Sequence, residues 1–433
     1  MKLDTKQTVK VGFAFLSICA FWQMYNSVIP LMLTNTFHLN ESISGVIMAA
    51  DNVLALFLLP LFGGLSDRCR LKMGKRKPFI LFGTLAAVVF MLLLPVMDNL
   101  FFTGKSVVTE ILFIVILGCL LVAMGTYRSP AVALMPDVTP KPLRSRGNAV
   151  INLMGAVGGV YALIMIKLLV GKGERPDYLP LFVSIAAVMV VAVGILLITI
   201  RESKLRKELE AQEQPEKTVE AVASEEKGSL PKDVKRSMMF MLLSIFFWFT
   251  AYNAVTTAFS RYTKVVWKME GGSFANCLMV ATVAAIFSYI PIGNISAKLG
   301  RKKTIMGGVL LMAACYGAAI FAREYHPIVN VAFALIGVAW AAINVNSYPM
   351  IVAMSSGSDV GKFTGTYYTF SMAAQILTPV LSGFLLENVS YNTLFPYALF
   401  FSLMAFLTMT QVRHGDVKPQ KKESILENFD VDD

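Results

Sequence analysis

Two charged side chains lie well inside long apolar stretches of the sequence: Asp51 and Arg128. Ionised groups are costly to hold in hydrocarbon, so charges in such positions usually contact an ion, a proton or a solute. A carboxylate that is removed from water is stabilised in its protonated form. We therefore predict that Asp51 binds and releases a proton; the alternative is a carboxylate fixed in a structural hydrogen-bond network. Arg128 would bind a solute hydroxyl or carboxylate, or instead brace a gate at the cytoplasmic face.

Uncharged polar side chains recur at spacings of three, four and seven residues, which places them on one face of a helix. Ser and Thr in apolar helices usually bond to the backbone of their own helix, so amides and aromatic rings are the better candidates for contacts with a ligand. Amides pair with hydroxyl groups, and an aromatic face covers the apolar face of a polyhydroxylated solute. The expected solute-binding residues are Gln23, Asn26, Arg128, Asn253, Trp340, Asn344, Tyr348 and Gln375.

A glycine-rich and basic segment occurs once in each half of the chain. The first copy is Gly63-Gly-Leu-Ser-Asp67-Arg68 followed by Gly74-Lys-Arg-Lys-Pro78, and the second is Gly293-Asn-Ile-Ser-Ala-Lys298-Leu-Gly300-Arg-Lys-Lys303. Ala297 stands where Asp67 would repeat, so the second copy lacks the acid. Internal duplication of this kind is typical of membrane proteins built from two structural repeats.

The polar residues of these segments are candidates for a gate at the inner face. Gly63 and Gly64 would let helices approach closely where the chain turns, because a Cβ would clash. Asp67 would pair with an arginine of a neighbouring helix, for which Arg146 is one candidate. Asp137 would belong to the same layer, or would be a helix cap or a solvated acid. The alternative for the basic residues is that they only set orientation in the membrane. The candidate gate residues are Gly63, Gly64, Asp67, Arg68, Asp137, Arg146, Gly293 and Arg301.

The elements that must position these residues are transmembrane helices. Charged residues make up only 15% of the chain and hydrophobic residues 56%, whereas soluble domains carry about 25% charged residues. Twelve apolar stretches approach or exceed the ~20 residues that cross a bilayer. We expect an all-α integral membrane protein of two six-helix bundles. The predicted spans are 11–34, 43–65, 78–97, 107–135, 146–170, 179–200, 237–262, 273–297, 304–322, 327–353, 363–386 and 391–412.

Lys and Arg concentrate in the loops that follow the predicted second, fourth and eighth spans. Such loops face the cytoplasm, so both termini are expected there and the protein in the cell membrane. Arg261, Lys264 and Lys268 are exceptions on the outer side. Residues 201–236 are rich in Glu, Lys and Gln, which predicts a charged cytoplasmic linker. The expected domains are an N-terminal bundle (1–200), this linker, a C-terminal bundle (237–412) and a cytoplasmic tail (413–433).

Other functional classes are not favoured. The net charge of +11 lies in loops between apolar spans, so it does not indicate nucleic-acid binding. The five cysteines and three histidines are scattered, which gives no metal site, disulfide framework or catalytic constellation. A phosphate-cradling Gly-Lys-Ser/Thr loop is missing, so ATP is not expected to supply energy. We expect a monomer in the bilayer that is not an enzyme and carries no cofactor or metal.

The Gly-x-Leu-x-Asp-Arg pattern at Gly63–Arg68, with its basic continuation, resembles the loop signature of the major facilitator superfamily. The longer segment to Ile80, together with Ala133-Leu-Met-Pro-Asp137, resembles sucrose/proton symporters. Its Gly-Lys-x-Lys-Pro part is also similar to glycoside–pentoside–hexuronide cation symporters. That group carries acids just before a helix-two proline, where sodium binds, whereas Leu58 and Leu59 stand before Pro60 here.

The resemblance implies a secondary transporter that works by alternating access of its two halves. Together with the amide and aromatic residues it predicts symport of a sugar or glycoside with a proton. The alternative is proton-coupled export of amphipathic drugs or metabolites, which the 30 Phe and 24 Met residues would suit if they lined a pocket.

Overall fold

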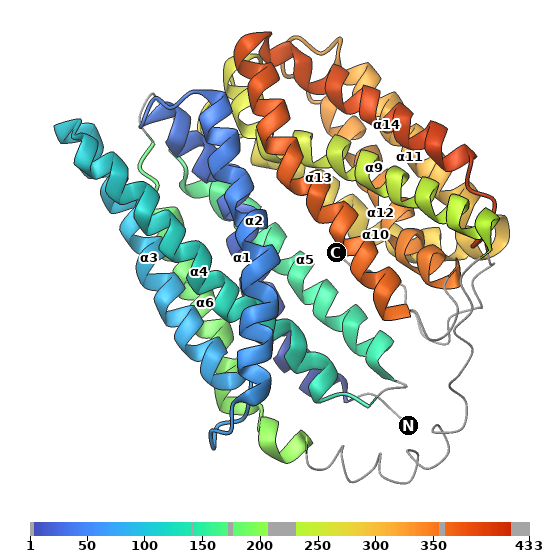
Figure 1. The fold of residues 1–433 in the computed structure, drawn as a ribbon. Helices are drawn as coiled ribbons and strands as arrows, with labels where there is room; N and C mark the ends of the chain where they lie inside the picture. The colour runs from blue at the N-terminus through green and yellow to red at the C-terminus, as the bar shows by residue number, and fades with distance from the viewer. Residues whose placement is uncertain (1–3, 141–142, 172–175, 207–230, 355–359, 417–433) are drawn as a thin grey trace. The chain divides into compact units, whose positions relative to one another are not determined.

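The computed structural model describes residues 4–140, 143–171, 176–206, 231–354 and 360–416, and long α-helices fill most of these ranges (Figure 1). The helices are α1 (Thr5–Asn35), α2 (Glu41–Arg68), α3 (Lys77–Gly104), α4 (Val107–Asp137), α5 (Arg144–Leu169), α6 (Leu179–Thr199), α9 (Lys232–Val265), α10 (Ala275–Leu299), α11 (Arg301–Ala319), α12 (Val329–Met354), α13 (Val360–Asn388) and α14 (Leu394–Thr410). A short 3-10 helix, η2 (Tyr391–Thr393), precedes α14. No strand occurs in the described ranges, which confirms the all-α prediction.

Eleven of the helices within the described residues are long and apolar enough to cross a membrane. α11 falls outside that set: its 19 residues begin with three basic side chains, which shorten its apolar part. Each predicted span nevertheless coincides with one helix. The fold is therefore that of a multi-pass membrane protein.

Some helices run beyond the apolar stretches into polar sequence. α1 begins at Thr5, where Asp4 Oδ1 accepts a hydrogen bond of 3.1 Å from Gln7 N and caps the helix. α9 begins at Lys232, directly after Pro231, without a side-chain cap. Hydropathy marks only the part of a helix in the hydrocarbon, so such polar first turns are missed. Residues 202–206 form one helical turn of the predicted linker, whereas 207–230 and 417–433 lie outside the described residues.

The chain separates into two compact units. Unit 1 comprises Met1–Asn40, Ala50–Gln214 and Met269–Asn276, and unit 2 comprises Glu41–Ala49, Pro215–Lys268 and Cys277–Asp433. In unit 1, α1 packs against α5 and α6, and α3 packs against α4 and α6. In unit 2, α9 packs against α13 and α14, and α11 packs against α12 and α14. The two sets of helix pairs correspond one to one, which confirms the pseudo-symmetric bundles.

The contact between α1 and α5 depends on a missing side chain. A Cβ at Gly158 of α5 would overlap the backbone carbonyl of Leu16 in α1, whereas a Cβ at the neighbouring Gly159 would have no heavy atom within 4 Å. Close backbone approach at small residues is a common way for transmembrane helices to pack, since lipid supplies no hydrophobic force between them. At Gly158 the backbones of α1 and α5 therefore lie too close for any side chain larger than hydrogen.

We predict that Gly158→Ala destabilises the protein by about 1–3 kcal/mol, because the added methyl forces the two helices apart. Gly159→Ala is the matched control: it adds the same methyl to open space and favours the helix. The measurement is thermal unfolding of each purified variant in detergent. Equal melting temperatures for the two variants would contradict the packing described above.

Candidate functional site

The carboxylate of Asp51 lies half-buried on α2 in unit 1. Its Oδ1 accepts hydrogen bonds from the backbone N of Asn52 at 2.6 Å and from Asn52 Nδ2 at 2.8 Å. Both donors belong to the next residue of the same helix. Asp51 and Arg128 are not within the 4.0 Å of an ion pair. The acid is therefore not fixed to another helix by an ion pair.

Arg128 is half-buried on α4 and lies over an aromatic ring of α1. The centre of its guanidinium group is 5.7 Å from the ring centroid of Trp22, a cation–π distance. The indole Nε1 of Trp22 and the hydroxyl of Tyr25 are buried and have no hydrogen-bond partner among the residues that the structure describes. Buried donors without partners are rare, so such groups are candidates for contact with a ligand or water. Unit 1 thus contains an acid, a cation and two unsatisfied donors on α1, α2 and α4.

Unit 2 contains an aromatic platform formed by Tyr252 of α9 and Trp340 of α12. Their rings are parallel, with centroids 3.7 Å apart and planes 5° apart. Phe249 meets Trp340 edge-on at 5.4 Å. Next to Tyr252 in the chain, Asn253 has a buried Nδ2 without a hydrogen-bond partner. An aromatic face and a free amide donor are together suited to a solute that has both apolar and hydroxyl surfaces. The sequence indicated Trp340 and Asn253, but the stack on Tyr252 requires the helix packing.

The other solute candidates lie on α1, α12 and α13. Gln23 Nε2 donates to Ser27 Oγ at 3.2 Å within α1. Asn344 is only 2% exposed on α12. Tyr348 packs edge-on against Tyr367 of α13, with ring centroids 5.6 Å apart. The remaining candidates, both half-buried, are Asn26 on α1 and Gln375 on α13.

Arg76, which directly precedes α3 in unit 1, forms ion pairs with both predicted gate acids. Its Nη2 donates to Asp67 Oδ1 at 2.6 Å, and its Nε donates to Asp137 Oδ2 at 2.7 Å. Its Nη1 also bonds to Ser66 Oγ and, at 3.3 Å, to the carbonyl of Gly63. The Arg76 side chain is only 7% exposed, whereas that of Asp67 is 58% exposed, and the cluster links α2, α3 and α4. Asp137 is an ion-pair partner rather than a cap or a solvated acid.

The gate expectations need three adjustments. The partner that the structure gives Asp67 is Arg76, and the side chain of Arg146 lies outside the described residues. α2 continues through the two glycines to Arg68, so the chain does not turn there. A Cβ at Gly63 would lie 3.0 Å from a side-chain oxygen of Ser129, but one at Gly64 would meet nothing within 4 Å. The expected close approach at Gly64 was therefore wrong.

An acid beyond the last helix of each unit caps a helix that begins with basic residues. Glu202, 1% exposed, follows α6; its Oε1 accepts from Lys75 N at 2.7 Å and its Oε2 from Lys77 N at 3.2 Å at the start of α3. Asp416 follows α14, and its Oδ1 accepts from Lys302 N at 3.0 Å at the start of α11. Carboxylates satisfy the free N–H groups of a helix start and favour its dipole. In unit 2, where Ala297 replaces the acid at Asp67, Asp416 therefore supplies a carboxylate next to the basic start of α11.

Arg301 and Gly293 are the gate candidates of unit 2. Arg301 Nη1 donates to the carbonyl of Pro349 at 3.3 Å, which connects the start of α11 with α12. Gly293 lies within α10 and is half-buried. Arg68, the last residue of α2 in unit 1, is exposed.

A buried ion pair at the start of α2 was not expected from the sequence. Arg261 of α9 donates through Nη1 to Glu41 Oε2, and the two side chains are only 3% and 6% exposed. Tyr391 of η2 donates its hydroxyl to the other oxygen of Glu41, and Ser44 Oγ accepts from Arg261 at 3.3 Å. All four residues belong to unit 2. Arg261, which looked like a misplaced topology charge, is therefore the centre of a polar network.

Residues 11–410 match the family model described as MFS/sugar transport protein. The chain belongs to this family. As an MFS/sugar transport protein it is a multi-pass membrane transporter of small-molecule solutes and not an enzyme. The major facilitator fold expected from the Gly63–Arg68 segment is thereby confirmed.

Two curated proteins are similar to parts of this MFS/sugar transport protein. The chloramphenicol resistance protein CraA of Acinetobacter baumannii is 31% identical over 101 residues, which cover 23% of the chain and 24% of the relative. The sucrose transport protein SUC3 of Arabidopsis thaliana is 26% identical over 137 residues, which cover 29% of the chain and 23% of the relative. Each match spans about a quarter of the relative's length.

Solved structures share the fold at low sequence identity. A bacterial homologue of the iron transporter ferroportin in an inward-facing state has a TM-score of 0.68 at 12% identity, covering 95% of this chain and 99% of that one. The nucleoside transporter NupG has a TM-score of 0.68 at 13% identity, with coverages of 95% and 100%. A peptide transporter POT in complex with alafosfalin has a TM-score of 0.67 at 12% identity, with coverages of 95% and 99%. These likenesses concern the fold alone.

Proposed function

We propose that the protein is a secondary active transporter that moves a sugar or glycoside together with a proton by alternating access. The observations that carry the solute class are the platform of Tyr252 and Trp340 and, on the same helix α9, the buried amide of Asn253 without a hydrogen-bond partner. A sugar ring presents an apolar face of C–H groups and an edge of hydroxyls, which a ring stack and an amide donor match. The family description and the partial match to a sucrose transport protein agree with this choice.

The proton is assigned to Asp51. It is a carboxylate in a membrane-spanning helix whose hydrogen bonds from Asn52 are local, with the guanidinium of Arg128 on a neighbouring helix of the same unit. A carboxylate held in this way can be charged or neutral without dismantling a helix contact, because no interhelical ion pair depends on it. Proton binding at Asp51 would then change the electrostatic environment of Arg128.

The inner cluster of Arg76, Asp67 and Asp137 would act as a conformational lock in this proposal. Two short ion pairs from one arginine hold three helices at one end of unit 1. A lock must favour one state and be released in the other, and ion pairs with partly exposed acids suit this because water can solvate them once separated. Asp67, with its side chain 58% exposed, is the member most easily released.

A second candidate function is proton-coupled export of amphipathic drugs. The observation that favours it is the partial match to a chloramphenicol resistance protein. The donors of Asn253, Trp22 and Tyr25 suit either solute class, since amphipathic drugs also carry polar groups. The family description, which names sugar transport and covers residues 11–410, favours the sugar over the drug, because the match to the resistance protein covers 101 residues.

The test is equilibrium counterflow in proteoliposomes with the full chain. Vesicles are loaded with an excess of one unlabelled compound and diluted into a trace of the same compound with label; the panel contains glucose, sucrose, a β-glucoside and chloramphenicol. The proposal predicts a transient overshoot of label for at least one sugar or glycoside. Counterflow of chloramphenicol alone would overturn it in favour of the exporter.

We predict that Trp340→Leu raises the KM for the transported sugar about tenfold with little change in the maximal rate, because the aromatic face is lost while bulk is retained. Trp340→Phe keeps a ring and should lose less. Phe400→Leu is the control, since this ring on α14 is 58% exposed and outside the platform. Initial rates of sugar uptake over a range of concentrations give both constants. Equal KM values for Trp340→Leu and Phe400→Leu would contradict the platform.

A further inference from the structure

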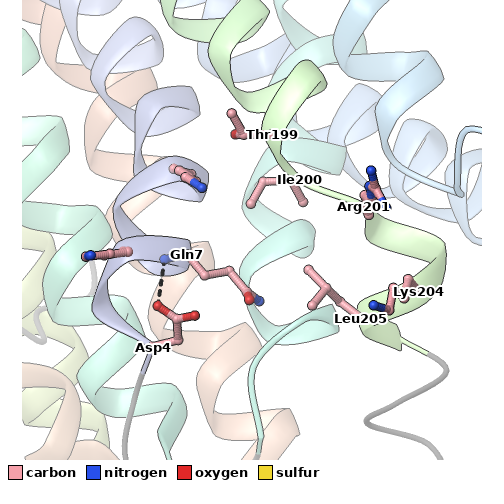
Figure 2. A pocket seen from close by; sticks show the side chains of 9 residues that line it. Asp4, Gln7, Thr199, Ile200, Arg201, Lys204 and Leu205 are labelled. Atoms are coloured by element: carbon pink, nitrogen blue, oxygen red, sulfur yellow. Dashed lines mark hydrogen bonds between the residues drawn. The ribbon is translucent and has the colours of Figure 1, made fainter.

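A basic pocket lies at one end of unit 1, apart from the residues assigned to solute, proton or gate. It has a volume of about 330 Å³ and lies between the start of α1 and the end of α6 with its continuation (Figure 2). α1 contributes Lys6 and Lys10, one helical turn apart, and the other side contributes Arg201 and Lys204. Figure 2 shows Arg201, Lys204 and Leu205 on the segment after α6, which faces Asp4 and Gln7 across the pocket.

The pocket carries an excess of positive charge. Among the described residues that line it, four are cationic and Asp4 is the single acid. The carboxylate of Asp4 accepts a hydrogen bond of 3.1 Å from Gln7 N and thereby caps α1. It is therefore committed to the helix and offsets only part of the charge. A guanidinium fork and several ammonium groups around one cavity are the donor set that binds phosphate oxygens.

The wall that carries Arg201 and Lys204 is held in place from behind. Glu202, between them in the sequence, is 1% exposed and is bonded to the start of α3. Lys77 Nζ donates to the carbonyl of Ile200 at 2.8 Å and to that of Leu197 at 2.7 Å. These bonds fix the backbone on either side of Arg201. The pocket is consequently a built feature of the fold, and less ordering entropy is lost when it binds a ligand.

The surroundings of the pocket indicate an amphiphilic ligand. α6 ends at Thr199, which lines the pocket, and the residue before it, Ile198, is 84% exposed. Val191, two turns earlier on the same face of α6, is 60% exposed. In a bilayer this apolar surface contacts acyl chains, and the level at which the helix ends is the level of the headgroups. A lipid whose phosphate lies in the pocket and whose acyl chains run along α6 would cover both the cationic and the apolar surface.

We propose that this pocket binds the phosphate of an anionic lipid headgroup in the leaflet at that end of α1 and α6. The concentration of Lys and Arg in loops of the same end makes this the cytoplasmic leaflet, whose lipids are the more anionic. A free phosphate ion shares the charge chemistry but would leave the exposed side chains of Val191 and Ile198 unused. The site is independent of which solute the protein carries.

The test is native mass spectrometry of the full-length protein in neutral detergent, titrated with dioctanoyl phosphatidylglycerol. Each Lys or Arg near an anionic group contributes about fivefold in affinity, so Arg201→Gln/Lys204→Gln should weaken binding of the first lipid about 25-fold. Lys6→Gln/Lys10→Gln, on the opposite wall, should weaken it similarly. The matched control is Arg70→Gln/Lys72→Gln, two cations of the loop after α2 that do not line the pocket.

Two further ligands separate the possible sources of phosphate. Dioctanoyl phosphatidylcholine, which is zwitterionic, should bind at least roughly tenfold more weakly than phosphatidylglycerol. Glycerol 3-phosphate at constant ionic strength should fail to displace the lipid. The proposal is overturned if both pocket double variants bind phosphatidylglycerol like the wild type, or if the control loses as much affinity as the pocket variants. It is also overturned if glycerol 3-phosphate displaces the lipid at equal concentration. A variant that unfolds is recognised by its melting temperature. In that case the affinity of the double variant on the opposite wall of the pocket is the test of the proposal.

Discussion

Asp51→Asn is expected to abolish accumulation of solute against its gradient while exchange of solute across the membrane continues. Asparagine has nearly the same shape as aspartate but carries no exchangeable acid proton, so the energy of a proton gradient no longer reaches the solute. Asp51 Oδ1 accepts its hydrogen bonds from Asn52, and an amide oxygen accepts them equally well. We therefore expect a loss of about 100-fold or more in concentrative uptake with little loss of stability.

Glu110→Gln provides the comparison for Asp51→Asn, since Glu110 is an acid in the first turn of α4 and not deep within it. This variant should accumulate solute like the wild type. The informative readout is the ratio of gradient-driven uptake to counterflow, because a general loss of function lowers both. If Asp51→Asn kept gradient-driven uptake with an unchanged pH dependence, the proton would have to be assigned elsewhere.

Arg261→Gln is expected to be the most destabilising single change among the polar residues. Its removal leaves the Glu41 carboxylate, 6% exposed, without its cation in the start of α2. Breaking a buried pair by removing one partner costs about 3–5 kcal/mol, far more than an exposed pair contributes. Tyr391 would remain as a donor to Glu41 but supplies no positive charge. We expect a fall of the melting temperature by several degrees, measured in detergent.

The double variant Glu41→Gln/Arg261→Gln tests whether the loss of stability comes from the unpaired charge of Glu41. Two neutral amides remove the unpaired carboxylate, so the double variant should be more stable than Arg261→Gln alone. Arg323→Gln is the control, because Arg323 is an exposed cation after α11. If the double variant were as unstable as the sum of both single variants, the two side chains would not be coupled and the ion pair would not stabilise the fold.

The twelve helices were predictable because hydropathy responds directly to the bilayer, but their ends were not. The start of α1 at Thr5 is capped by Asp4, and α9 begins at Lys232 directly after Pro231; both first turns are polar and fall outside the apolar stretches. α11 shows the opposite limit: three basic residues at its start reduce its apolar length although it packs as a full member of unit 2.

Some of the polar residues of the site were likewise recognisable from the sequence, and others were not. Asp51 and Arg128 were recognisable because a charge inside an apolar run is costly and is rarely retained without a function. Glu202 and Asp416 were not, since each follows the last helix of its unit in a charged segment that is typical of solvated chain. Their role as helix caps depends on partners more than a hundred residues away in the chain. The partner of Arg261 was not predictable for the same reason, because Glu41 begins a helix that lies far away in the chain, before the linker.

The proposed function requires that a proton gradient drive a sugar through this protein. The most direct measurement is uptake of the sugar identified by counterflow into proteoliposomes with an imposed pH gradient, acid outside, and the membrane potential clamped by potassium and valinomycin. We predict accumulation above the external concentration that collapses when a protonophore is added. No accumulation under the pH gradient, or accumulation that requires a sodium gradient instead, would contradict it.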